Sequence, residues 1–166
     1  AHGIYLTTTV YSNIVYSNTI TTNGTGNGIY LLTTIYDNKV YSNVITAYGG
    51  GQAIRLQTTA YNNSIYDNNI TTTFSSGHGI MLTGTATNNS IYRNNVKVTG
   101  GSAQGIRLQS TSYENYIYRN NITTFGSSGH GILLQTTSYN NTVHSNTIKT
   151  NQSGIGISLF STAYGN

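Results

Sequence analysis

The chain has 166 residues, of which only 6% are charged, and its formal net charge is +4. It contains neither cysteine nor proline, so disulfides cannot hold the fold together and no proline interrupts a strand ladder. The few basic residues are scattered, which argues against a nucleic-acid-binding surface. No apolar run approaches the roughly 20 residues needed to cross a bilayer. Abundant Thr, Ile, Val and Tyr argue against disorder and favour strands.

A four-residue motif recurs along the chain every 25 or 26 residues. A fixed period of this size is typical of solenoids, whose units stack because each is too small to bury its own apolar face. The period predicts about six and a half coils in a chain of 166 residues. The copies of the motif are Gly3–Leu6, Gly28–Leu31, Ala53–Leu56, Gly79–Leu82, Gly105–Leu108, Gly131–Leu134 and Gly156–Leu159.

The coil that begins at Ala53 contains three short segments in which apolar and polar residues alternate. Alternation with a period of two is typical of strands that are buried on one face. The pattern predicts that Ile54 and Leu56 point inward from the first strand, Ile65 from the second, and Ile70 with Thr72 from the third. Coils about 4.8 Å apart would then form a rod on the order of 30 Å long.

Asparagine occupies two equivalent positions in nearly every coil, at the two corners between the predicted strands. Stacked Asn side chains can hydrogen-bond to one another as a ladder, and Asn tolerates the left-handed backbone of a sharp corner. A third column, represented by Thr59, is expected at the end of the first strand, where hydroxyls can satisfy turn groups. The predicted ladders are Asn13, Asn38, Asn63, Asn89, Asn115, Asn141 and Asn166 at one corner, and Asn18, Asn43, Asn68, Asn94, Asn120 and Asn146 at the other.

The repeated pattern Gly-Ile-x-Leu, followed by Asn-x-Ile-Tyr-x-Asn-x-Ile-Thr, resembles the right-handed parallel β-helix repeat of the pectin-lyase-like superfamily. The resemblance covers essentially the whole chain and implies one all-β domain over residues 1–166 with three strands per coil. The superfamily includes polysaccharide lyases, hydrolases and epimerases, but also surface proteins and adhesin stalks. The resemblance therefore implies a fold without implying an activity.

The charged and titratable residues do not converge on one site in the repeat alignment. Asp37 and Glu114 share a corner three coils apart, roughly 14 Å at normal strand spacing, and Asp67 lies at the other corner. A pair of glycosidase carboxylates needs a separation of about 5–10 Å. We therefore expect no catalytic residues, no metal site and no cofactor, which argues against an enzyme.

The remaining charged and titratable residues have simple structural interpretations. Asp67 is expected to pair with Arg93 of the next coil. His144 replaces a tyrosine in an aromatic column. The other three histidines, which precede the repeat glycine, are interpreted as polar loop residues: His2, His78 and His130.

Two outward columns are candidate binding surfaces. Stacked tyrosines after the inward residue of the second strand could contact sugar rings or a neighbouring subunit: Tyr16, Tyr41, Tyr66, Tyr92 and Tyr118. A second tyrosine column, which includes Tyr61, precedes the first corner. On the outward face of the first strand, a groove for an acidic polysaccharide is predicted at Tyr5, Tyr30, Arg55, Gln57, Arg107, Gln109 and Gln135.

Seven Asn-x-Ser/Thr sequons are possible glycosylation sites, a number close to the one that chance predicts for this composition. They begin at Asn23, Asn62, Asn69, Asn88, Asn121, Asn140 and Asn151.

The sequence leads to three hypotheses about function. Neither end of the repeat carries a polar cap, so the chain is expected to be a segment of a longer solenoid or filament, in contact with neighbouring coils or with other copies. The first hypothesis is a structural, extracellular or surface-exposed solenoid in a stalk or fibre. The alternatives are a carbohydrate-binding module and a lyase or epimerase scaffold whose catalytic residues lie elsewhere.

Overall fold

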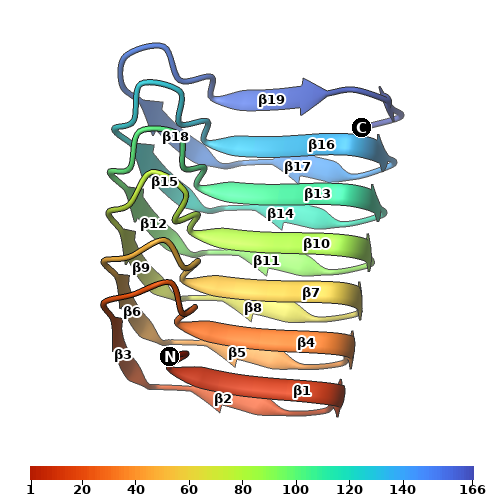
Figure 1. Ribbon diagram of the computed structural model, residues 1–166. Coiled ribbons are helices and arrows are strands. Elements are labelled where there is room, and N and C mark those ends of the chain that lie inside the picture. The colour runs from red at the N-terminus through yellow and green to blue at the C-terminus, as the bar shows by residue number, and fades with distance from the viewer.

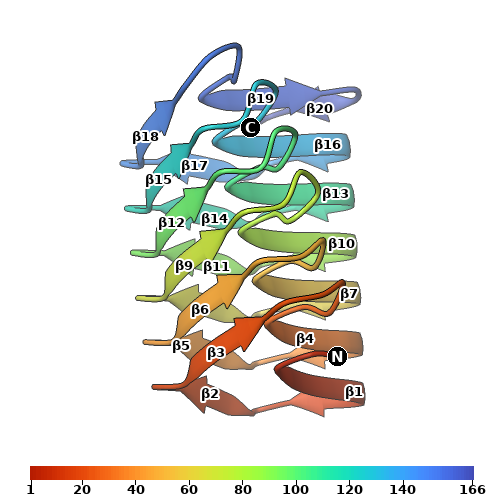
Figure 2. The ribbon, with the colours of Figure 1, turned by 60° about the vertical axis from the view of Figure 1, so that its left-hand side comes forward.

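The computed structural model describes residues 1–166 as a rod of stacked coils without helices (Figure 1). Twenty strands form three parallel sheets, and each complete coil contributes one strand to each sheet. Figure 2 shows the loops that connect the third strand of one coil to the first strand of the next. The predicted division of each coil into three strands is therefore confirmed.

Sheet A contains the first strand of each coil. Its strands are β1 (Ile4–Tyr11), β4 (Ile29–Tyr36), β7 (Ile54–Tyr61), β10 (Ile80–Thr87), β13 (Ile106–Tyr113), β16 (Ile132–Tyr139), β19 (Ile157–Phe160) and β20 (Ala163–Tyr164). Sheet B contains β2 (Ile14–Tyr16), β5 (Lys39–Tyr41), β8 (Ser64–Tyr66), β11 (Ser90–Tyr92), β14 (Tyr116–Tyr118) and β17 (Thr142–His144). Sheet C contains β3 (Thr19–Thr22), β6 (Val44–Ala47), β9 (Asn69–Thr72), β12 (Asn95–Val98), β15 (Asn121–Thr124) and β18 (Thr147–Thr150).

The inward residues of the three sheets form one continuous core along the rod. In the coil of β7, Ile54 and Leu56 are buried, as are Ile65 in β8 and Ile70 in β9. The predicted inward direction of Thr72 is also confirmed. The register pairs each inward residue with its counterpart one period away, so that Ile54 lies between Ile29 and Ile80. Stacking therefore buries on both sides the apolar residues that one coil alone would leave exposed.

The first strand of each coil except the last is longer than predicted. In β7 it continues past Thr59 to Tyr61, and Ala60 is a further inward residue. The strand bends at Thr58, whose φ is 93°. Gly84 occupies the same column with a φ of 96°, a backbone conformation that glycine adopts without steric cost. The expectation that the Thr59 column ends the strand is therefore wrong, because the chain turns one residue earlier within a continuous strand.

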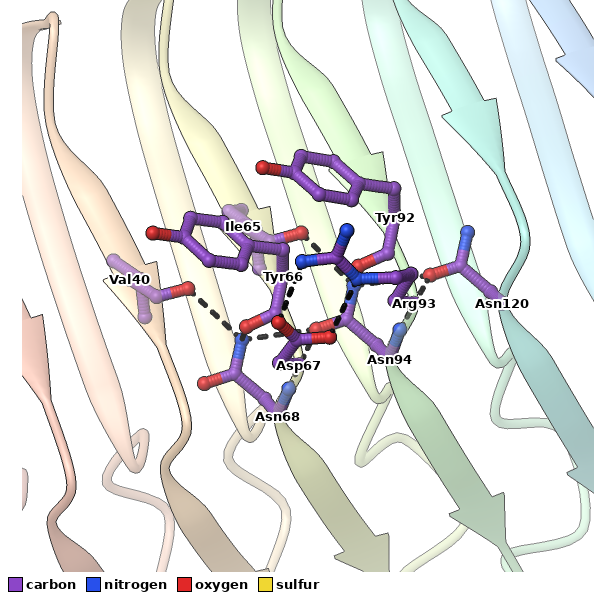
Figure 3. A network of polar contacts seen from close by, with 9 residues as sticks. All are labelled: Val40, Ile65, Tyr66, Asp67, Asn68, Tyr92, Arg93, Asn94 and Asn120. Atoms are coloured by element: carbon purple, nitrogen blue, oxygen red, sulfur yellow. Dashed lines mark hydrogen bonds and ion pairs between the residues drawn. The ribbon is translucent and has the colours of Figure 1, made fainter.

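The two predicted asparagine ladders are confirmed at the corners between sheets A and B and between sheets B and C. At the first corner, the backbone N–H and the side-chain amide of Asn63 both donate to Oδ1 of Asn89, at 3.0 and 2.9 Å. The same amide donates to the backbone oxygen of Ile35 in the preceding coil, at 3.0 Å. Asn68 and Asn94 repeat this arrangement at the second corner (Figure 3). Each ladder residue inside the stack therefore joins the coils on both sides of its own.

The corners differ from the prediction in one respect. The left-handed residue is the one before the ladder asparagine, as at Asn62 with a φ of 56° and Asp67 with a φ of 54°. These preceding residues are exposed, whereas the ladder residues Asn63 and Asn68 are buried. The exposed residue thus makes the turn, and the ladder asparagine remains free to direct its amide along the rod.

We predict that Asn89→Ala lowers the free energy of unfolding by about 3–5 kcal/mol, because buried backbone groups lose their partners. Asn89 is fully buried, and its amide donates to the backbone oxygen of Ala60 at 2.9 Å. Denaturant unfolding followed by circular dichroism measures the change. The matched control is Asn23→Ala, at an exposed asparagine outside the ladders. Equal stability of the two variants would contradict a stabilising role for the ladder.

Candidate functional site

The carboxylates lie where the repeat alignment placed them. Asp37 and Glu114 follow β4 and β13, which are three steps apart in sheet A. Asp67 lies at the corner between sheets B and C and forms the predicted ion pair with Arg93 (Figure 3). Two hydrogen bonds of 2.8 and 2.7 Å join the guanidinium to both carboxylate oxygens and hold the pKa of Asp67 below its usual value. Because both side chains are substantially exposed, solvent screens the pair and it contributes little to stability.

The outward tyrosines of sheet B form a continuous stack. Ring centroids of Tyr41, Tyr66 and Tyr92 are 4.8 and 4.9 Å apart, with the rings within 6° of parallel. Tyr16 and Tyr118 extend the stack, and His144 lies parallel to Tyr118 at 5.2 Å, as its interpretation as an aromatic substitute predicted. The spacing equals the distance between neighbouring strands, so in-register stacking brings the rings into contact.

The stack carries a cation on its surface beside the corner between sheets B and C. The guanidinium carbon of Arg93 lies 4.9 Å from the ring centroid of Tyr92 and 5.8 Å from that of Tyr66. Partial burial, together with the neighbouring phenols, raises the pKa of Tyr66 and Tyr92. These phenols therefore remain neutral well above physiological pH and act as hydrogen-bonding, apolar surface.

The second tyrosine column, at the end of the sheet A strands, is interrupted. Tyr36 and Tyr61 stack at 4.9 Å, and Tyr113 and Tyr139 stack at 4.9 Å. Thr87 occupies the register position between Tyr61 and Tyr113. This surface therefore consists of two separate aromatic stacks.

The outward face of sheet A, where a polysaccharide groove is predicted, has no hollowed pocket but carries two distinct groups of polar and aromatic side chains. At the first, Tyr5 stacks on Tyr30 at 5.3 Å, and the Tyr30 hydroxyl donates to Gln57 at 2.6 Å. The guanidinium of Arg55 lies 5.5 Å from the Tyr30 ring centroid. At the second, Arg107 donates to Gln135 at 2.8 Å.

Met81 separates Arg55 from Arg107 in the register of sheet A, and Leu133 follows Arg107. Each of these two apolar side chains has only 8% of its surface exposed, so both pack closely between the neighbouring side chains of this face. Gln109 lies in register with Gln135 on the same face. The structure therefore brings Tyr30, Arg55 and Gln57 together, and Arg107 with Gln135, while Met81 interrupts the polar surface.

A third ladder, not predicted from the sequence, runs through the loops before sheet A. Four side chains of this column accept a hydrogen bond from the backbone N–H one coil further on, whereas Gln52 and Gln104 in the same column do not, and Oε1 of Gln104 has no partner. Nδ1 of His78 accepts from Gln104 at 3.0 Å, and Oδ1 of Asn27 accepts from Gln52 at 2.9 Å. His2 and His130 accept in the same way from Asn27 and Ile155. These histidines lie in loops, as interpreted from the sequence, and their ring nitrogens in addition join successive coils.

His78 is the most enclosed of these histidines, with 5% of its surface exposed. Its second ring nitrogen, Nε2, lies 3.0 Å from a terminal guanidinium nitrogen of Arg107. Burial, followed by the charges of Arg107 and Arg55, lowers the pKa of His78 to about 4. The imidazole is therefore neutral at physiological pH, between two permanent cations.

The sequons lie outside the core. Their acceptor asparagines are exposed, apart from the half-buried Asn151. Two of them belong to a short surface ladder in sheet C, in which Asn95 donates to Asn69 at 3.0 Å and Asn121 donates to Asn95 at 3.1 Å. This ladder was also not predicted, because the column contains Thr19, Val44 and Thr147 at its other positions.

No group of three or more His, Cys, Asp or Glu side chains is placed to hold a metal ion. No pocket is hollowed into the surface. None of the elements is a helix long and apolar enough to span a membrane.

A family model described as "Right handed beta helix region" matches residues 32–166, most of the chain. It agrees with the parallel sheets of the structure and with the right-handed coil that the resemblance to the pectin-lyase-like superfamily implied. The chain shows no significant match to a curated protein or to a solved structure.

We predict that the free energy of unfolding falls by roughly 3 kcal/mol as pH drops from about 7 to 4, through the titration of His78 alone. Its pKa is lowered from 6.5 to about 4 in the folded state, so the unfolded chain binds the proton first. The contribution of neutral His78 to the free energy of unfolding is fully present above pH 6.5 and is lost as pH falls towards 4. Urea unfolding at a series of pH values measures this loss.

The control for the pH series is His78→Asn. Asn27 shows that an asparagine in this column can accept the same backbone hydrogen bond, and asparagine does not titrate. The variant should therefore lose the part of the pH dependence that belongs to His78. An identical dependence in both proteins would contradict the assignment.

Proposed function

Because the chain belongs to the right-handed β-helix family, we propose that it is a structural solenoid, extracellular or surface-exposed, within a stalk, fibre or filament. The observation that carries this proposal is the continuity of the corner ladders. Asn13 donates to Asn38 at the start of the chain, and Asn141 donates to Asn166 at its end. Every coil between them repeats the same bonds, so the rod resists separation of its coils along its whole length.

The outer surface supports the same proposal. The tyrosine stack of sheet B presents rings with an apolar face and a hydrogen-bonding hydroxyl, a combination that favours contacts between proteins. Side-by-side association of rods through this stack would give a fibre without changing the interior of a coil. Neighbouring coils or further copies of the chain are the partners that this proposal implies.

Electron microscopy of the native material tests the structural proposal. We expect rods that extend beyond the roughly 30 Å given by six and a half coils at normal strand spacing, either singly or in regular filaments. Substitution of Tyr41, Tyr66 and Tyr92 by Ser should leave single rods intact while reducing lateral association, because only outward rings are removed. Isolated short rods that release unsaturated sugars from a polysaccharide would overturn the proposal in favour of a lyase.

A second candidate function is the binding of an acidic polysaccharide on sheet A. The specific observation is that Arg55 and Arg107 lie on one outward face without a carboxylate partner, since the one salt bridge of the chain joins Arg93 to Asp67. Tyr5 and Tyr30 extend this face with stacked rings. Guanidinium groups beside aromatic rings suit a chain of sugars that carry acidic groups.

We predict that Arg55→Ala combined with Arg107→Ala abolishes binding to acidic polysaccharides on a glycan array. Removal of both cations eliminates the charge-assisted hydrogen bonds that this face can donate. The matched control combines Lys97→Ala with Arg119→Ala, which removes the same charge from exposed positions elsewhere on the rod. Absence of glycan binding by the unaltered chain would reject this candidate and leave the structural proposal standing.

A further inference from the structure

The third ladder fixes which ring nitrogen of His78 carries the proton. The backbone N–H of Gln104 can only donate, so Nδ1 of His78 must accept at 3.0 Å. A neutral imidazole has one N–H group, which must then be on Nε2. His2 and His130 accept through the same nitrogen from their own neighbouring coils, which supports this orientation of the ring.

With this assignment, both nitrogen atoms in the contact between His78 and Arg107 are hydrogen-bond donors. Nε2 of His78 and the Arg107 guanidinium nitrogen are 3.0 Å apart, and both carry hydrogens. Two N–H groups at this distance do not form a hydrogen bond with each other. They can instead donate together to one oxygen that lies beside both nitrogens.

The charges around His78 indicate which kind of chemical group would supply such an oxygen. Arg55 and Arg107 occupy the strands on either side of β10, and His78 leads into β10 through Gly79. Neither arginine has a carboxylate partner. The buried Nε atoms of both arginines also lack a hydrogen-bond partner. Two uncompensated cations and several free donors favour an anion over a neutral group.

We propose that His78 and Arg107, with Arg55 as a more distant second cation beyond Met81, form a site for an oxyanion, a carboxylate or a sulfate group, beside the N-terminal ends of the central strands β7, β10 and β13 of sheet A. Arg107 and the Nε2–H of His78 donate to one of its oxygens, and Arg55 supplies the second cation. The site deepens the second candidate function by naming the group recognised on an acidic glycan, and it can also take a small free anion. Its geometry is set by the third ladder, which holds the imidazole in place.

Binding of sodium sulfate and of oligogalacturonate to the full chain, measured by calorimetry at constant ionic strength, tests the proposal. We expect saturable binding of at least one probe, weakened about tenfold or more in Arg107→Gln, since a charge-assisted hydrogen bond is lost. His78→Asn, which keeps the acceptor for Gln104 but removes the Nε2–H donor, should weaken it similarly. Arg119→Gln removes the same charge from an exposed position and should change the affinity by less than about twofold.

Nitrogen-15 NMR of the unaltered protein tests the site without depending on any variant. We expect the His78 ring to be in the Nε2–H form and its resonances to shift on addition of sulfate, while those of the exposed His144 stay unchanged. An Nδ1–H form, or equal responses of the two rings, would overturn the proposal.

The outcomes separate this site from the glycan proposal. Sulfate binding that depends on Arg107 and His78, without oligogalacturonate binding, would support the anion site and count against the glycan. Oligogalacturonate binding that is unchanged in both variants would reject the anion site and leave the glycan proposal standing on other residues. No saturable binding of either probe would reject both.

Discussion

The buried asparagines at the corners are the constraint on which the remaining structure depends. Each amide is enclosed away from water, and its partners lie mainly in the coils before and after its own, as the bonds of Asn63 to Ile35 and Asn89 illustrate. A buried polar group without a partner costs more than a hydrogen bond gains. A coil therefore satisfies its corners only when it is stacked in register, which couples local turns to the whole rod.

The same constraint separates the interior from the surface. Inward positions must match from coil to coil because they share a core and a ladder, whereas outward positions need only fit a parallel strand. The outward columns therefore differ in residue type although the coils share one backbone arrangement. They include the tyrosine stacks, the Arg93–Asp67 pair and the column of Arg55, Met81 and Arg107. A rod of this kind can support a structural role along its length and still carry a localised binding site on one face.

The third ladder connects these two aspects. It follows the same physical rule as the corner asparagines, because a side-chain acceptor in one coil receives a backbone N–H from the next. At His78 the acceptor is a ring with a second nitrogen, so a structural bond also orients a donor beside Arg107. Fold stability and the proposed anion recognition therefore share one side chain.

The sequence by itself determined the period, the three strands, the inward Ile54, Leu56, Ile65 and Ile70, and both asparagine ladders, because identical residues recur at identical spacing. Only the tertiary structure decided where the backbone turns, since residues as different as Asn62, Asp67 and Arg93 all adopt positive φ before a ladder residue. It also revealed the third ladder, whose members accept the same backbone hydrogen bond but differ in residue type, as His78 and Asn27 do. The approach of Arg107 to His78, 29 positions away, follows from stacking and has no local sequence signal.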